Sequence, residues 1–201
     1  MATRRNAGPE RYYWRVTQWL MPCFSFFPPY GDNPYGGHAF VPIDDENCWA
    51  FSIDYHPRRP LSEAELEAMH AGKGIHVRVA EGGFIPVANK RNDYLMDRAA
   101  QRAKKTFSGV FDVGTQDAAV QESMGAVQDR AREHLVTSDN NIIMTRRRLT
   151  EAAETAARGD APPGLEPAQQ HARALSMVLP REISLLDAVA HAQKAHQSAD
   201  L

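Results

Sequence analysis

The sequence has few cysteines, no long apolar run and no excess of charge of one sign. Its 201 residues contain only two cysteines, Cys23 and Cys48, which do not form a CxxC pair. We expect both to be reduced core thiols of a cytoplasmic protein. No apolar run reaches the roughly 18 residues of a membrane-spanning helix, so we expect no membrane association. The 23 basic and 25 acidic residues give a net charge of −2, which offers no reason to bind nucleic acid.

The first part of the chain has the patterns of strands. Residues 1–11 are polar, and we expect them to be frayed. Aromatic and β-branched residues that alternate with period two predict one long strand over 12–27, bent at Pro22. Two further strands, 38–43 and 48–56, flank the turn residues Asp-Asp-Glu-Asn and predict an antiparallel hairpin.

The rest of the chain has the patterns of helices. Ser62 and Glu65 form a capping box that opens a short helix. The strongest helical periodicity runs from about Thr115 to Leu135. Further helices are expected near 93–105, after Asp139 and after Ser184, with a linker at 159–168. Strands followed by helices predict an α+β fold with helices packed on one face of an antiparallel sheet.

One carboxylate interrupts the apolar stripe of the predicted 115–135 helix. Asp117 shares that stripe with Val120, Met124, Val127, Ala131 and Leu135. A carboxylate on a buried face costs several kcal/mol, on the order of its desolvation penalty, unless it is paired, protonated or bound to a metal. Two interpretations stay open here: Asp117 caps the helix N-terminus, or it is an oxygen ligand of a metal such as the iron of a two-His, one-carboxylate oxygenase.

The histidines do not supply an obvious pair of imidazole ligands. His70 and His76 are six residues apart across a Gly-Lys-Gly turn, which is not the i, i+4 spacing of two ligands on one helix face. His134 lies 17 residues beyond Asp117 on the same predicted helix, about 25 Å away at the helical rise. The sequence also has no CxH spacing for an iron–sulfur cluster, no glycine-rich phosphate loop and no GxSxG.

Long segments of the chain resemble a known enzyme family. They are YYWRVTQWLMP (12–22), PPYGDNPYGGHAFVPIDDENCW (28–49), YHPRRPLSEAEL (55–66), NDYLMDRAAQR (92–102) and the specific run TFSGVFDVGTQDAAVQESMGAVQDRAREHLVTSDNNIIMTRRRL (106–149). They resemble the C-terminal part of the catalytic domain of Rieske non-haem iron ring-hydroxylating oxygenases of the phthalate 4,5-dioxygenase type.

The resemblance implies a fold and a metal site. The fold is a helix-grip (START-like) antiparallel sheet with a long C-terminal helix, incomplete at its N-terminal side. Residues 1–158 would be the C-terminal portion of the catalytic domain, and residues 159–201 a linker and C-terminal helix. In this family a mononuclear Fe(2+) is held by two His and one Asp, and the Asp lies at the position of Asp117.

Four further residues are candidates for substrate binding. His38 matches a strand that lines the substrate pocket in this family. Arg15 lies among aromatic residues, where a guanidinium clamps an aromatic acid or forms a structural ion pair. Phe107 and Ser108 precede the Asp117 helix and are candidate pocket walls. The tryptophans are expected in the core or in a pocket wall.

The implied function is that of a fragment. The chain lacks the Cys and His ligands of the family's Rieske [2Fe–2S] cluster and the two iron-binding histidines, so the N-terminal Rieske portion would be a separate or missing partner. The resemblance implies an oxidoreductase acting on phthalate-like aromatic carboxylates with O2 and electrons from a reductase, by dioxygenation or demethylation, as a homotrimer in the family. The alternatives are a non-catalytic small-molecule-binding remnant and a truncated inactive product.

Overall fold

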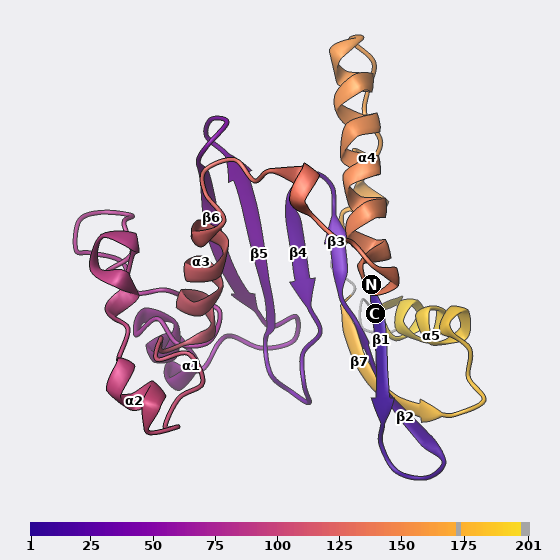
Figure 1. Cartoon of the computed structure of the whole chain (residues 1–201). Coiled ribbons are helices and arrows are strands. Elements are labelled where there is room, and N and C mark those ends of the chain that lie inside the picture. Colours follow the sequence, from indigo (N-terminus) through magenta and orange to yellow (C-terminus); the bar gives the residue numbers. More distant parts are fainter. Residues whose placement is uncertain (172–173, 198–201) are drawn as a thin grey trace. The chain divides into compact units, whose positions relative to one another are not determined.

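The chain folds into two compact units in the computed structural model, which describes residues 1–171 and 174–197 (Figure 1). The first unit comprises Met1–Val41, Trp49–Tyr55 and Ala131–Leu201, and the second comprises Pro42–Cys48 and His56–Arg130. The predicted boundary at residue 158 lies inside the first unit. Among the described residues, no helix has both the length and the apolar character needed to cross a bilayer.

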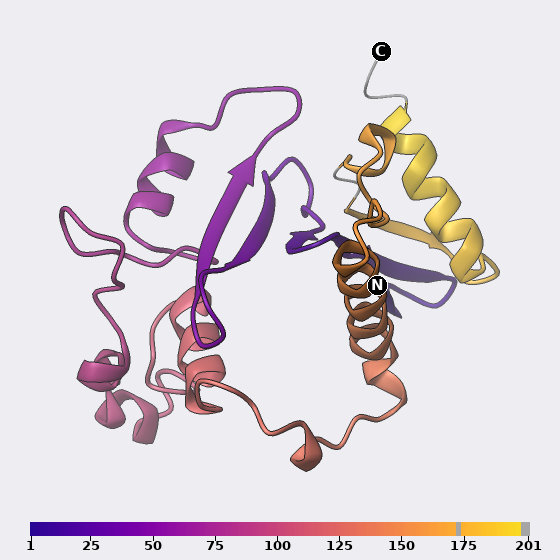
Figure 2. The ribbon, with the colours of Figure 1, turned by 90° about the horizontal axis from the view of Figure 1, so that it is seen from above.

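The first unit contains a three-stranded antiparallel sheet in the order β1–β2–β7. Its strands are β1 (Ala2–Asn6), β2 (Arg11–Val16) and β7 (Leu175–Pro180). Helix α5 (Leu185–Gln197) contacts β2 and lies beside this sheet (Figure 2). The hydroxyl of Ser184 accepts a hydrogen bond from the N–H of Asp187, which confirms the predicted start of this helix.

A second antiparallel sheet has four strands in chain order. They are β3 (Gln18–Leu20), β4 (Phe24–Phe27), β5 (Tyr35–Pro42) and β6 (Cys48–Tyr55). The turn between β5 and β6 is closed by Asp44, whose carboxylate accepts the N–H groups of Glu46 and Asn47 and whose pKa these bonds lower. Phe26, Tyr35 and Ala174 form a buried cluster, and Tyr55 stacks on Tyr35 at a centroid distance of 5.2 Å.

The long helix of the first unit is α4 (Asn140–Ala157). Its Ala152 is buried, and its Arg146 makes two hydrogen bonds to Glu133, with N···O distances of 2.5 and 2.8 Å. This bidentate pair ties α4 to the segment that precedes it.

The second unit consists of short helices and loops. It contains α1 (Glu63–His70), the 3-10 helix η1 (Lys90–Leu95), α2 (Arg98–Arg102) and α3 (Val113–Ser123). The first turn of α3 packs against the loop that contains Gly74. The Gly114 N–H donates a hydrogen bond to the carbonyl oxygen of Gly74 at 2.8 Å. A Cβ at position 114 would lie 2.6 Å from the carbonyl oxygen of Ile75, so only glycine fits this approach.

Several sequence predictions are confirmed. The α+β class, the hairpin of β5 and β6, the capping box on Ser62 and the helix after Asp139 are all present. Of the tryptophans, Trp14 is buried with 3% of its surface exposed, as expected for a core residue, whereas Trp49 is 40% exposed and is not one.

Other predictions are wrong. The chain at 12–27 forms three strands rather than one, and Pro22 lies in the turn between β3 and β4. The predicted helix to Leu135 ends at Ser123, because Gly125 follows with φ of +92°, a conformation typical of helix termination. Cys48 is exposed, whereas Cys23 is half-buried; both are free thiols.

Residues 1–11 are not frayed, since β1 pairs with β2 along its whole length. The Arg4 guanidinium lies 4.5 Å from the ring centroid of Tyr12 and 5.6 Å from that of Trp14. Cation–π contacts therefore stabilise a strand whose own sequence is polar.

Candidate functional site

Asp117 lies inside helix α3 rather than at its cap. The helix begins at Val113 with Asp112 as its N-cap residue, two residues before the predicted start, so the capping interpretation of Asp117 is wrong. The Asp117 side chain is exposed and, among the described residues, forms no hydrogen bond or ion pair.

The expectation that Asp117 lies on a buried apolar face is also wrong. Val113, Val120 and Met124 share its side of α3 by helical spacing, and their exposed fractions are 54%, 64% and 49%. Helix α3 is held against the unit elsewhere, by the close approach at Gly114 and by Glu122, which accepts a hydrogen bond from the Tyr94 hydroxyl at 2.5 Å. Burial of the phenol, together with this hydrogen bond to Glu122, raises the pKa of Tyr94 to about 12.

The described residues do not fit the donor set of a mononuclear iron or of an iron–sulfur cluster. Among the residues whose side chains the structure describes, no group of three or more His, Cys, Asp or Glu is placed to hold a metal ion. One carboxylate does not hold Fe(II) against water by itself. The interpretation of Asp117 as a metal ligand therefore depends on the family resemblance and not on burial.

The four predicted substrate-binding residues are divided between the two units. Arg15 is exposed on β2, and His38 is half-buried on β5 of the other sheet, between Phe27 and Phe40. Phe107 and Ser108 belong to the second unit. Phe107 is 98% exposed, and the Ser108 hydroxyl is hydrogen-bonded to the backbone of Val110.

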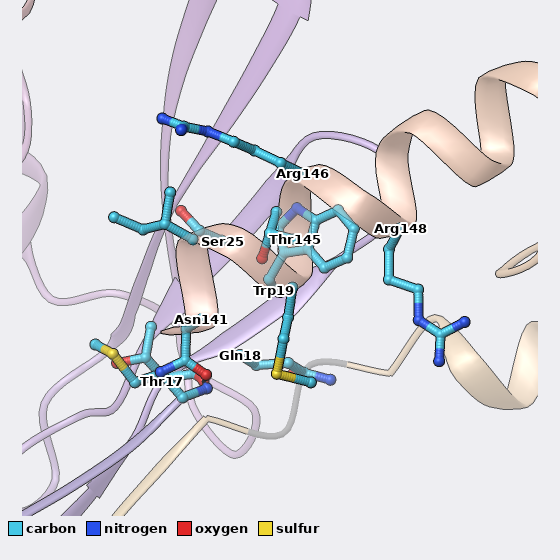
Figure 3. Close-up of a pocket in the computed structure, with 11 residues that line it drawn as sticks. Thr17, Gln18, Trp19, Ser25, Asn141, Thr145, Arg146 and Arg148 are labelled. Atoms are coloured by element: carbon cyan, nitrogen blue, oxygen red, sulfur yellow. Dashed lines mark hydrogen bonds between the residues drawn. The ribbon is translucent and has the colours of Figure 1, made fainter. Parts of the chain in front are cut away.

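The first unit contains a cleft that the sequence did not predict. It has a volume of about 540 Å³ and lies where β3 and β4 meet α4 (Figure 3). Its lining includes Trp19, Ser25, Ile142, Met144, Thr145 and Arg148. The volume is in the range of small-molecule sites, and the mixture of apolar, hydroxyl and cationic groups suits a small amphipathic anion.

The two arginines of the cleft differ in their ion pairing. Arg146 is neutralised by its bidentate bonds to Glu133, and these bonds raise the pKa of Arg146. Arg148 is 66% exposed, and its single bond to Glu151 is 3.3 Å long. The two side chains extend from α4 in different directions (Figure 3). Of the two arginines, Arg148 has the longer and single acidic contact, so it is the more available one for an incoming carboxylate.

His38 is the predicted residue that lies beside this cleft. In the register of β4 and β5 it is the partner of Ser25, and Ser25 lines the cleft. The sequence did put Trp19 forward as a core or pocket-wall residue, but no local signal joins it to α4 more than a hundred residues later.

Comparison with known proteins identifies the family. A family model described as LigXa C-terminal domain like matches residues 3–198. The chain belongs to this family. Membership confirms the resemblance to the C-terminal part of a Rieske-type oxygenase that the sequence predicts.

Two curated relatives of this LigXa C-terminal domain-like chain are oxygenase subunits. The 3-chlorobenzoate-3,4-dioxygenase oxygenase subunit of Comamonas testosteroni is 28% identical over 183 residues, covering 85% of the chain and 42% of the relative. The phthalate 4,5-dioxygenase oxygenase subunit of Pseudomonas putida is 27% identical over 149 residues, covering 74% of the chain and 33% of the relative. The chain thus spans less than half the length of either relative.

Proposed function

We propose that the chain is a catalytic-domain portion of the oxygenase component of an aromatic-ring dioxygenase. The observation that carries the proposal is the family match over residues 3–198, together with two relatives that are both dioxygenase oxygenase subunits. The names of the relatives specify 3-chlorobenzoate and phthalate, which are aromatic rings with a carboxylate attached directly. The proposed substrate class is therefore an aromatic carboxylate, oxidised with O2 and electrons from a reductase.

The cleft between β3, β4 and α4 is the proposed binding site for the aromatic acid. The Trp19 indole and Met144 offer apolar surface to the ring, and Arg148 offers a guanidinium to the carboxylate. The hydroxyls of Ser25 and Thr145 add hydrogen-bonding groups to the lining. His38, next to Ser25 on the sheet, is the proposed polar neighbour of the bound acid.

Asp117 is proposed as one metal ligand of a site that other groups complete. Its carboxylate is exposed and unpaired among the described residues, so it is accessible to a metal or to a partner polypeptide. Two imidazoles from a polypeptide that carries the Rieske domain would complete a two-His, one-carboxylate set for Fe(II). Phe107 and Ser108, which precede α3, are proposed as pocket residues on this side, and a trimer as the assembly.

A second candidate is a binding module without oxygenase chemistry. It is favoured by the cleft in the first unit, where the lining residues that the structure describes include no His, Asp or Glu. Such a module would bind an aromatic acid without a metal ion.

Isothermal titration calorimetry of the metal-free full chain with phthalate and 3-chlorobenzoate tests the feature that both candidates share. We expect saturable binding that Trp19→Ala and Arg148→Gln weaken. No heat with either acid would contradict the proposed binding site. A hydroxylation assay then separates the two candidates. The chain is mixed with Fe(II), a reductase and a polypeptide that carries the Rieske domain and two iron-binding histidines, and only an oxygenase portion would yield hydroxylated product.

A further inference from the structure

One face of the β1–β2–β7 sheet is cationic. The antiparallel register places Arg5 opposite Tyr13 and Thr3 opposite Arg15, and Arg11 lies two residues before Tyr13 on the same strand. Directly opposed and alternate residues project to the same face of a sheet. Three arginines are therefore the neighbours of Tyr13 on this face of the sheet.

Strand β7 and a neighbouring loop complete this face. Ser176 and Val178 are the β7 partners of Arg15 and Tyr13. The Ser176 hydroxyl donates to the carbonyl oxygen of Pro29, and the next residue, Tyr30, lies edge-on to Tyr13 at a centroid distance of 6.4 Å. Tyr30 is 72% exposed and Val178 is 48% exposed. The side chains that the three strands place on this face include no Asp or Glu.

The arginines of this face have no acidic partner in the part of the chain that the structure describes. Arg5, Arg11 and Arg15 are exposed, and none of them forms an ion pair there. By contrast, Arg147 and Arg148 on α4 both pair with Glu151. Like charges that gather on one sheet face without opposite charges disfavour the isolated chain and favour an acidic partner.

We propose that this Arg–Tyr face, made of Arg5, Arg11, Tyr13, Arg15 and Tyr30, docks an acidic protein surface. Arginine and tyrosine are enriched at protein interfaces, and the planar guanidinium fits a carboxylate with two parallel hydrogen bonds. The proposal does not depend on the proposed function, because it concerns a sheet that does not line the cleft.

The geometry favours an acidic protein over single-stranded nucleic acid. The Arg5 guanidinium lies 4.8 Å from the centroid of the Tyr13 ring, so a face of that ring is already covered. Nucleic-acid platforms on sheets need open aromatic faces on which bases stack. Carboxylates need only the edges of the guanidinium groups, and the three arginines are exposed residues.

Fluorescence anisotropy with a labelled oligoglutamate peptide tests the proposal on the full chain. We expect binding that weakens with added salt, and about a tenfold loss of affinity in the triple variant Arg5→Ala, Arg11→Ala, Arg15→Ala, given the modest strength of each exposed ion pair. The variant with lysine at the same three positions keeps the positive charge but lacks the planar guanidinium groups. Its loss of affinity is expected to be smaller than that of the triple alanine variant.

A matched control removes three exposed cations of the second unit, Arg98, Arg102 and Lys105, and is expected to bind oligoglutamate as the unchanged chain does. Circular dichroism verifies that the variants fold. Equal binding by the triple alanine variant would overturn the proposal. Tighter, arginine-dependent binding of oligothymidylate or of phosphatidylserine vesicles than of oligoglutamate would overturn it as well, because the face would then serve nucleic acid or a membrane.

Discussion

His38 lies directly opposite Ser25 in the antiparallel register of β5 and β4. Ser25 lines the cleft, so the imidazole is on the same sheet face as the cleft, held between Phe27 and Phe40 at ring centroid distances of 5.5 and 5.4 Å. A residue that the sequence put forward for substrate binding is thus the neighbour of a site that only the structure shows.

Replacing His38 with phenylalanine separates packing from polar contact. His38→Phe keeps an aromatic ring between Phe27 and Phe40, so we expect the free energy of unfolding to change by less than about 1 kcal/mol. Loss of one polar contact is expected to weaken 3-chlorobenzoate binding about threefold, near 0.7 kcal/mol. Urea unfolding and calorimetry check the two values. Unchanged affinity would remove His38 from the proposed site.

Arg148 and its neighbour Arg147 give a matched pair for the carboxylate contact. Arg148 lines the cleft, whereas Arg147 does not. Both pair with Glu151. We expect Arg148→Gln to weaken phthalate binding about three- to tenfold, the strength of a partly exposed charge-assisted bond. Arg147→Gln is expected to bind as the unchanged chain does, and equal losses in both variants would point to overall charge instead.

The carboxylate of Glu65 makes the second unit sensitive to acid. Hydrogen bonds from Arg59 and from the backbone N–H of Ser62 lower the pKa of Glu65 from 4.5 to about 2. A folded-state pKa below the ordinary value means that the stabilisation is complete above pH 4.5 and is lost as the pH falls toward 2.

Glu65→Gln is therefore expected to destabilise the second unit at neutral pH and to make little difference at about pH 2. Urea unfolding at neutral pH and at about pH 2 measures this. Glu67→Gln, on the same helix, is the control. A constant destabilisation by Glu65→Gln at all pH values would contradict the ionic origin of the effect.

Gly114 allows α3 to approach the loop that contains Gly74, Ile75 and His76. Since a Cβ there would meet the carbonyl oxygens of Ile75 and His76 at 2.6 and 2.8 Å, Gly114→Ala is expected to destabilise the protein by about 1–3 kcal/mol. At Gly83 the nearest atom would be 3.9 Å away, so Gly83→Ala is expected to be neutral. Denaturant unfolding of both variants checks the difference, and equal stabilities would contradict the close approach.

The buried indole of Trp14 carries an N–H that finds no hydrogen-bond partner within the described residues. Trp14→Phe removes this N–H, and burying such a group without a partner costs about 1–3 kcal/mol. Removing that cost offsets the stabilisation lost with the smaller contact area of phenylalanine. We expect its free energy of unfolding to stay within about 1 kcal/mol of the unchanged chain, whereas Trp14→Ala loses about 3–5 kcal/mol. Calorimetric unfolding compares them. Equal losses in both variants would show that the N–H is satisfied.

Local chemistry made much of the fold predictable. The capping box of Ser62 and Glu65, the Asp44 turn and the strand-forming runs of β5 and β6 all act within a few residues, and each appears in the structure. The stop signal of Gly125 was also present in the sequence, but the apolar spacing from Val120 to Leu135 concealed it.

Long-range pairing could not be predicted in the same way. Strand β1 is polar and exists because β2 offers it hydrogen bonds and aromatic rings, and β7 joins the same sheet from far along the chain. The cleft brings Trp19 together with Thr145, which no local pattern relates. Asp117 was found by periodicity, yet its exposed position shows that periodicity did not predict its surroundings.

The most direct test of the central claim measures hydroxylated product from phthalate and 3-chlorobenzoate. The full chain is mixed with Fe(II), a reductase and a polypeptide that carries a Rieske domain and two iron-binding histidines. The account predicts product and bound iron that both depend on Asp117, so that Asp117→Asn abolishes them while Asp112→Asn, at the exposed N-cap of the same helix, retains them. Absence of product from both acids, with iron content unaffected by Asp117→Asn, would contradict the account.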